Sequence, residues 1–360
     1  MNELPTIVVG DSGEVPAQPN TMPPLALLGL VALVFALLWA FGGVAPPAAD
    51  RIPVPVRLVG SSAADVESRL YEVSANGSRE APLPDLREAQ FDRSGNLLAG
   101  IAPSDAPRGG VLTVGPPEGP FQQLSDDVRS FAWHDRRPGS LAYVSPWGPV
   151  AAINTWEQGA TNREVIRDRG LMHRFGDWGY AVTRPGSIQR ADLYDASGDF
   201  EQQVPGYPAG TGPGAYLVFS PQVPVRSLPR EGTEAVAYTE AGEPFDVPWL
   251  NEGELPYVIE AAPDGRRFAV HLGGAYETGL GEVLIARFDG AIETRISRAA
   301  TPAALAWSGD GRYLVVARRG PADELEIGFY DLDAQTLDVA PLPEIPSSVV
   351  IWDIAVPDAG

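Results

Sequence analysis

A repeat of about 44 residues dominates the chain between residues 48 and 360. Its two clearest copies are Ala261–Val270 (AAPDGRRFAV) and Trp307–Val316 (WSGDGRYLVV). In each copy a short segment leads into an Asp-Gly turn, and an apolar strand follows. Glycine readily takes the positive φ that such a tight turn needs, and aspartate caps the turn locally. Repeats of this length and pattern predict four-stranded blades arranged radially around an axis.

Further copies share an aromatic or small residue, a short turn with glycine, and an apolar strand. The anchor residues lie at positions 91, 133, 175, 219, 261, 307 and 355, with spacings of 42, 42, 44, 42, 46 and 48 residues. The copy at Phe219 is degenerate, and its following strand is expected at 235–238. Seven units of 44 residues need 308 residues, and the segment 48–360 offers 313. The spacing predicts an all-β, seven-bladed β-propeller, with six and eight blades as alternatives.

The first and last repeats are incomplete in complementary ways. Ser68–Val73 has the pattern of an outer strand without an inner strand of its own, whereas the copy at Ala355 has only an inner strand. We therefore expect strands near 68–84 and near 349–357 to share one blade. Such a blade closes the ring and removes exposed sheet edges. The predicted domains are a linker and first strand over 47–64 and a propeller over 65–360.

The turn sequences resemble those of a known repeat family. Trp307-Ser308-Gly309-Asp310-Gly311, Ala262–Gly265 and Phe219–Pro221 are similar to the inner turn of the Tol-system periplasmic propeller and, more loosely, of WD-repeat proteins. The dipeptide Trp352-Asp353 occurs once and is not a regular blade ending. The resemblance implies a β-propeller that binds or organises other proteins, a role that some relatives combine with a hydrolase domain. Fold alone does not fix function.

The segment before the repeats predicts a membrane anchor. Residues 1–22 form an acidic tail that we expect to be disordered, and Leu25–Ala45 contains 21 residues without a charge. At about 1.5 Å per residue, a helix of this length spans the hydrocarbon layer. We therefore predict a single transmembrane helix over 23–46. A buried core helix is one alternative. A cleaved signal peptide is another, but the chain lacks a basic start, and Pro46 would follow the cut.

The surroundings of the predicted helix bear on its orientation and packing. Arg51 and Arg57 follow the span, and no cation precedes it, which favours a cytoplasmic propeller. Long domains cross membranes largely regardless of charge, so we expect a single-pass protein of the cell membrane with an extracytoplasmic propeller. Ala32, Ala36 and Ala40 share one helix face and could pack closely against a partner helix.

Composition excludes several classes of function. The chain has 47 Asp and Glu against 26 cationic residues, a formal charge of −21, and no cysteine. All the cations are arginine. A nucleic-acid partner is not expected, since such binding needs a basic face. Disulfides and thiolate metal sites are impossible. The three histidines fall in different repeats, and short metal-binding, phosphate-loop and nucleophile-elbow motifs are missing. We predict no catalytic residue, metal or cofactor.

Three tryptophans are candidate binding residues. Trp147, Trp156 and Trp249 do not occupy the anchor positions of the repeat, and Trp147 and Trp249 lie in turn-rich sequence. Exposed loop aromatics often anchor protein interfaces. The alternative is that these side chains pack between blades.

The sequence thus favours a membrane-anchored propeller that acts as a protein-binding or scaffold module at the cell envelope. The alternatives are an enzyme of the propeller funnel (a hydrolase or lyase) and a small-ligand-binding envelope protein. An inward cluster of His, Arg and acidic side chains at the funnel mouth would favour the enzyme. A flat apolar patch containing Trp147 or Trp249 would favour protein binding.

Overall fold

A computed structural model describes most of the repeat region. The chain divides into two units, Met1–Pro46 and Pro47–Gly360, and every described residue belongs to the second. The description covers residues 52–357 except 63–67, 87, 105–108, 147–150, 161, 168–169, 184–189, 206, 213–214, 221–235, 239–243, 246–253, 275–279, 288–290, 301 and 321–323. The predicted tail (1–22), the predicted membrane helix (23–46) and its face of Ala32, Ala36 and Ala40 lie outside these residues. Within the described part, no helix has the length and apolar character needed to cross a membrane.

The described strands form seven four-stranded antiparallel sheets. The sheet that contains both ends of the repeat region has the order β28 (Val349–Ala355), β1 (Val56–Ser62), β2 (Ser68–Ser74) and β3 (Gly77–Pro82). The next two, named from the inner strand outward, are β4 (Glu88–Phe91), β5 (Leu98–Ala102), β6 (Gly110–Gly115) and β7 (Gln122–Val128), then β8 (Phe131–Trp133), β9 (Ser140–Ser145), β10 (Ala152–Glu157) and β11 (Arg163–Ile166).

The remaining four sheets follow in chain order. They are β12 (Leu171–Gly176), β13 (Gly179–Thr183), β14 (Arg190–Tyr194) and β15 (Phe200–Pro205); β16 (Tyr207–Gly212), β17 (Ala215–Ser220), β18 (Val236–Tyr238) and β19 (Pro244–Phe245); β20 (Glu254–Ala261), β21 (Arg267–Gly274), β22 (Leu280–Arg287) and β23 (Ile292–Ala300); and β24 (Pro302–Trp307), β25 (Tyr313–Arg319), β26 (Leu325–Asp331) and β27 (Thr336–Pro341).

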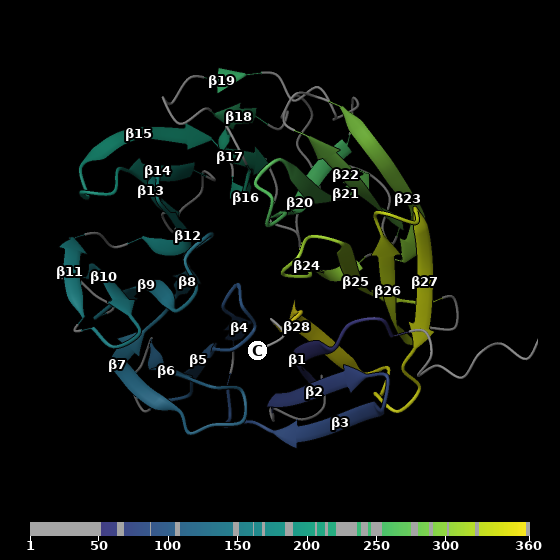
Figure 1. Ribbon diagram of the computed structural model, residues 1–360. Helices are drawn as coiled ribbons and strands as arrows, with labels where there is room; N and C mark the ends of the chain where they lie inside the picture. Colours follow the sequence, from purple (N-terminus) through teal and green to yellow (C-terminus); the bar gives the residue numbers. More distant parts are fainter. Residues whose placement is uncertain are drawn as a thin grey trace, which may run out of the picture. The chain divides into compact units, whose positions relative to one another are not determined.

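The sheets are arranged around a common centre, and this arrangement confirms the predicted all-β propeller. Each sheet contacts the next, and the last contacts the first through β24 and β28. The first strand of each repeat unit lies nearest the centre, and the last lies at the rim (Figure 1). In the closing sheet, β28 pairs with β1 from Arg57–Ala355 to Ser62–Val349. Strands from the two ends of this unit therefore share one sheet.

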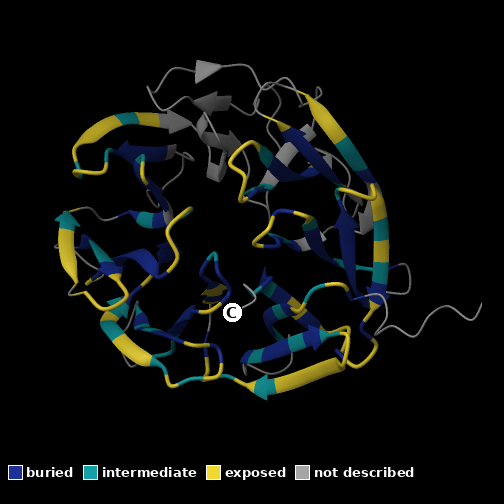
Figure 2. Cartoon of the chain, viewed as in Figure 1, coloured by how far each residue is buried: buried dark blue, intermediate teal, exposed yellow. Residues whose placement is uncertain are grey.

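The core lies between neighbouring sheets. The middle strands β9 and β26 are buried along their whole length, whereas the outer strand β3 is largely exposed. Figure 2 shows this gradient from a buried interior to an exposed rim. One apolar cluster joins Leu97 and Leu112 to Trp133 and Tyr143 of the next sheet. Apolar side chains on both sheet faces therefore hold the ring together.

The degenerate fourth repeat differs from the prediction. Phe219 belongs to β17, the second strand of its sheet, and not to an inner strand. The inner strand is β16, which lies in a segment rich in glycine and proline. It pairs with β17 and contacts β20 of the next sheet. Backbone hydrogen bonding to neighbours does not require apolar side chains, so composition conceals this strand.

Candidate functional site

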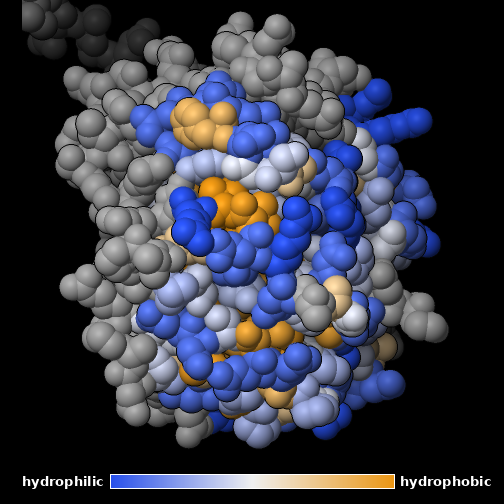
Figure 3. Space-filling view, turned by 90° about the vertical axis from the view of Figure 1, so that its left-hand side faces the viewer, coloured by the Kyte–Doolittle hydropathy of each residue, from blue (hydrophilic) through white to orange (hydrophobic). Residues whose placement is uncertain are grey.

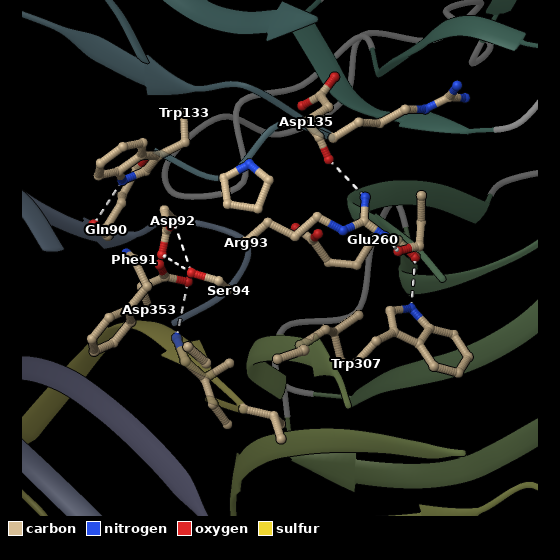
Figure 4. A pocket seen from close by; sticks show the side chains of 18 of the residues that line it. Gln90, Phe91, Asp92, Arg93, Ser94, Trp133, Asp135, Glu260, Trp307 and Asp353 are labelled. Atoms are coloured by element: carbon tan, nitrogen blue, oxygen red, sulfur yellow. Dashed lines mark hydrogen bonds between the residues drawn. The ribbon is translucent and has the colours of Figure 1, made fainter. Parts of the chain in front are cut away.

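A polar cavity occupies the centre of the ring. Its volume is about 540 Å³, and residues from five of the seven sheets line it. The lining comes from inner strands and the turns after them, at 90–94, 132–138, 258–263, 305–309 and 352–356. Figure 4 shows side chains from these segments converging on the cavity. Parts of the turns remain exposed, including 136–138 and 263–266. We call this surface of turns the mouth face.

Along the cavity wall, two tryptophans at anchor positions form hydrogen bonds to the neighbouring blades. Trp133 Nε1 donates to the backbone oxygen of Gln90 at 2.8 Å, and Trp307 Nε1 donates to that of Glu260 at 2.9 Å. Each acceptor lies in the inner strand of the preceding sheet (Figure 4). The same anchor residue therefore contributes an apolar ring to the core and a hydrogen bond between blades.

The carboxylate of Asp92 organises two turns at once. Its side chain is 3% exposed and accepts from the Ser94 hydroxyl and from the backbone N–H groups of Asn96 and Leu97. Its second oxygen also accepts from the N–H of Gly139 in the next sheet, at 3.1 Å. The segment 92–96 is thus a turn whose aspartate is saturated by protein donors.

Asp353 performs a similar task in the closing sheet. Its Oδ2 accepts from the N–H of Phe91 at 2.7 Å, and its Oδ1 accepts from the N–H of Ile354 at 2.9 Å. The first bond connects β28 to β4, the inner strand of the adjacent sheet. Two of the acidic groups in the cavity wall therefore serve to join blades.

His134 is buried at the end of β8. Its Nδ1 accepts from the backbone N–H groups of Arg136 and Arg137 at 3.1 and 3.0 Å, which places the ring proton on Nε2. Nε2 lies 3.5 Å from an oxygen of Asp177 in the next sheet. Burial lowers the pKa of His134, as does Arg137, and the Asp177 charge partly opposes both. The imidazole is thus a neutral component of the turn.

Arg93 crosses the cavity. Its Nη1 donates to the backbone oxygen of Asp135 at 2.7 Å, and its Nη2 donates to that of Ala261 at 3.3 Å. Asp135 follows β8, in the sheet next to that of Arg93, whereas Ala261 belongs to β20, in a sheet that is not adjacent. Arg136 also lines the cavity, and its side chain is exposed.

Of the three tryptophans predicted to bind a partner, the structure describes only Trp156. Trp156 lies in β10, is 6% exposed and belongs to the core cluster of Trp133 and Leu141. The prediction of an exposed binding aromatic is therefore wrong for Trp156, because alternation along β10 directs its indole between two sheets. Trp147 and Trp249 lie outside the described residues.

No broad apolar patch is visible on the described surface of the side shown in Figure 3. Hydrophilic residues cover most of it, and the hydrophobic ones form separate spots. Metal-ligating clusters of three or more acidic or histidine side chains are likewise missing from the described residues. The turn 195–199 contains side-chain oxygens of the kind that bind metal ions. Its Asp195 Oδ1 accepts hydrogen bonds from the N–H groups of Ser197 and Asp199.

Sequence reasoning missed Arg93 and Asp353 as residues of the cavity. A usable signal existed for Arg93, because it follows Asp92 in the turn after an anchor residue. The turns after β4, β8, β20 and β24 line the same cavity. Asp353 belongs to the isolated Trp352-Asp353 dipeptide, whose position in β28 explains why it faces β4.

Comparisons with known proteins identify the fold. No protein-family model and no curated protein matches the sequence. The β-propeller domain of the Trilobed protease from Pyrococcus furiosus is similar, with a TM-score of 0.52, 12% identity, and coverage of 82% of this chain and 97% of that chain. TolB from Acinetobacter baumannii gives 0.50 at 10% identity, with coverage of 86% and 68%. An oligogalacturonate lyase in complex with manganese gives 0.50 at 13%, with coverage of 78% and 82%. At these identities the likeness establishes a β-propeller and not an activity.

Proposed function

We propose that this chain is a membrane-anchored β-propeller that binds a protein partner through its mouth face and acts as a scaffold at the cell envelope. The observation that carries the proposal is the state of the polar groups around the cavity. Asp92, Asp353 and the Nδ1 atom of His134 already accept hydrogen bonds from the protein itself. These groups position turns and blades, which suits a rigid binding surface.

The enzyme alternative has one feature in its favour. Histidine, arginine and acidic side chains do converge on the cavity, as expected of a funnel enzyme. A general base, however, needs a free lone pair within reach of the substrate. The Nδ1 of His134 is occupied by backbone donors, and the ring is 1% exposed. This arrangement favours binding over catalysis.

The resemblance of the turn sequences to the Tol-system periplasmic propeller is consistent with an envelope protein, and the apolar segment 25–45 supports anchoring to the membrane. The full chain should remain in the membrane pellet after carbonate extraction, with the propeller protected from protease added on the cytoplasmic side. Release of the full chain into the supernatant would contradict the anchor. Digestion of the propeller from the cytoplasmic side would contradict only its orientation.

Partner binding can be tested with two charge-matched double variants of the full chain. Arg136→Glu with Arg266→Glu changes the exposed mouth face. Arg79→Glu with Arg167→Glu changes the rim by the same charge, where the side chains are 73% and 82% exposed. The measurement is quantitative affinity isolation from native membranes after cross-linking.

We expect the amount of a specific co-isolated protein to fall at least about tenfold with the mouth variant, since reversing a charge at an interface places like charges opposite one another. The rim variant should retain it. Equal recovery with both variants would exclude the mouth face as the binding surface.

A further inference from the structure

Arg93 lines the central cavity and forms no ion pair with any described carboxylate. We propose that the cavity is a binding site for a carboxylate-bearing ligand and that the Arg93 guanidinium is the group that recognises the carboxylate. The binding of a carboxylate by Arg93 does not depend on the proposed function. Only the idea that a partner protein supplies the carboxylate rests on it.

Arg93 is held in place before any ligand binds. Its two hydrogen bonds reach backbone oxygens of two different sheets, 42 and 168 residues away in sequence. Both acceptors are neutral carbonyl groups. The guanidinium is therefore fixed across the cavity while its positive charge stays uncompensated, and a fixed donor costs less entropy to bind than a mobile one.

The guanidinium of Arg93 also has N–H donors that no described acceptor uses. An arginine carries five N–H donors, and two are used, so three have no described acceptor. Arg93 forms no ion pair with any described carboxylate, whereas Arg312, Arg318 and Arg57 each do. An unpaired cation in a half-buried cavity is unexpected in a chain with 47 acidic residues and 26 arginines.

Four acidic residues line the cavity, Asp92, Asp135, Glu260 and Asp353, and no described ion pair joins any of them to Arg93. The carboxylates of two of them are bound elsewhere. Asp92 accepts from its own turn and from Gly139, and Asp353 accepts from Phe91 and Ile354. Their charges are stabilised by backbone N–H groups, which lets them coexist near an arginine without approaching it. An incoming anion would therefore compete with backbone carbonyls for Arg93 and not with another carboxylate.

The chemistry of the site favours a carboxylate over a phosphate. A carboxylate is planar and accepts two parallel N–H bonds from a guanidinium. It also carries a single charge, whereas the formal charge of −21 opposes the entry of multivalent anions. Val258, Leu305 and the flank of Trp307 provide apolar wall in the same cavity. The expected ligand thus joins a carboxylate to an apolar or aromatic body.

The test uses the full chain in detergent and titration calorimetry with phenylacetate and phenylacetamide, which differ in charge and little in shape. We expect phenylacetate to bind at least about tenfold more tightly, as for a charge-assisted hydrogen bond. Arg93→Met should remove this preference, and Arg79→Met at the rim should keep it. Equal affinity for the two probes, no heat with either, or an unchanged preference in Arg93→Met would overturn the proposal.

Arg93→Met also removes two bonds between sheets, so Arg93→Lys provides a second variant that retains the charge. Lysine lacks the paired donors, and we expect a weaker preference for phenylacetate with an unchanged thermal midpoint. If Arg93→Lys binds phenylacetate as well as the parent chain does, the assigned role of the guanidinium is wrong.

The source of the carboxylate is tested by competition. A blocked glutamate tripeptide that displaces phenylacetate, when its glutamine counterpart does not, assigns the carboxylate to a protein. Displacement by neither tripeptide assigns it to a small molecule. If the chain does not bind phenylacetate but still binds a partner protein through the mouth face, this inference is wrong and the proposed function is unaffected.

Discussion

At the scale of single residues, the fold imposes strong local environments. His271 lies in β21 and is 3% exposed. Burial lowers its pKa to about 4, because transfer from water disfavours the charged imidazolium. An unfolded histidine has a pKa of about 6.5. Between these values the unfolded chain binds a proton that the folded chain does not.

Stability should therefore fall as the pH is lowered from about 6.5 to 4, by about 3 kcal/mol from this residue alone. His271→Gln removes the titration and should show a correspondingly smaller loss over the same range. Urea denaturation of both chains at several pH values measures the difference, which cancels the contribution of the acidic groups. Parallel stability curves for the two chains would show that His271 is not responsible.

Two glycines in equivalent hairpin turns should respond differently to alanine. Both have positive φ, +127° at Gly179 and +66° at Gly265. A Cβ at Gly179 would lie 1.9 Å from the backbone oxygen of Tyr194, whereas one at Gly265 would have no atom within 4 Å. Gly265→Ala should cost about 1 kcal/mol for the left-handed conformation alone.

Gly179→Ala should cost several times as much, because the backbone of β14 must also move. Thermal unfolding of the two variants gives the comparison, with Gly265→Ala as the control for conformation without contact. Similar losses in both would mean that β14 yields easily to the added methyl group.

At the scale of elements, hydrogen bonds between inner strands keep the blades in register. The indole of Trp307 donates to the oxygen of Glu260 in the preceding sheet, and Trp133 repeats this bond to Gln90. These bonds form at the two anchor positions that carry tryptophan, 133 and 307. They explain why tryptophan occupies an anchor where phenylalanine would also fill the core.

Trp307→Phe should destabilise the protein more than Trp156→Phe does. Both changes remove similar volume from the core, but only the first leaves a carbonyl without its described indole donor. We expect an additional loss of about 1 kcal/mol, measured by chemical denaturation. Equal losses would show that the Glu260 oxygen finds another donor, such as water.

At the scale of the whole propeller, one sheet joins strands from the two ends of the described region. β28 pairs with β1 and contacts β24 and β4 of the neighbouring sheets. Its buried side chains include Val349, Ile351 and Ile354. Closure of the ring therefore depends on β28, the last described strand in chain order.

A chain that ends at Pro346, and thus lacks β28, should lose cooperative thermal unfolding and aggregate. Its loss exposes the edge of β1 and the apolar cluster beneath it, and open edges promote association. A chain that lacks only residues 358–360 is the matched control. Light scattering with calorimetry would check this expectation, and a monomeric truncated chain with an unchanged midpoint would contradict it.

Much of the architecture was accessible from local patterns. The anchors at Phe91, Trp133 and Trp307 predicted inner strands followed by tight turns, and these occur in β4, β8 and β24. Turn chemistry and strand alternation depend on a few neighbouring residues, so the sequence carries them directly. The prediction for the fourth repeat was wrong because its inner strand, β16, is rich in glycine and proline and is stabilised by pairing with neighbouring strands. The prediction for Trp156 failed because its position off the repeat did not reveal which side of β10 it faces.

By itself, the sequence determined an all-β repeat with its Asp-Gly turns, and it predicts an apolar span over 25–45. The tertiary structure alone decided the cavity and its chemistry. Arg93 meets its acceptors only because ring closure brings together residues 42 and 168 positions apart. Likewise Asp353 reaches Phe91 across 262 positions. Such contacts depend on how blades pack around the centre, a long-range property that no local pattern encodes.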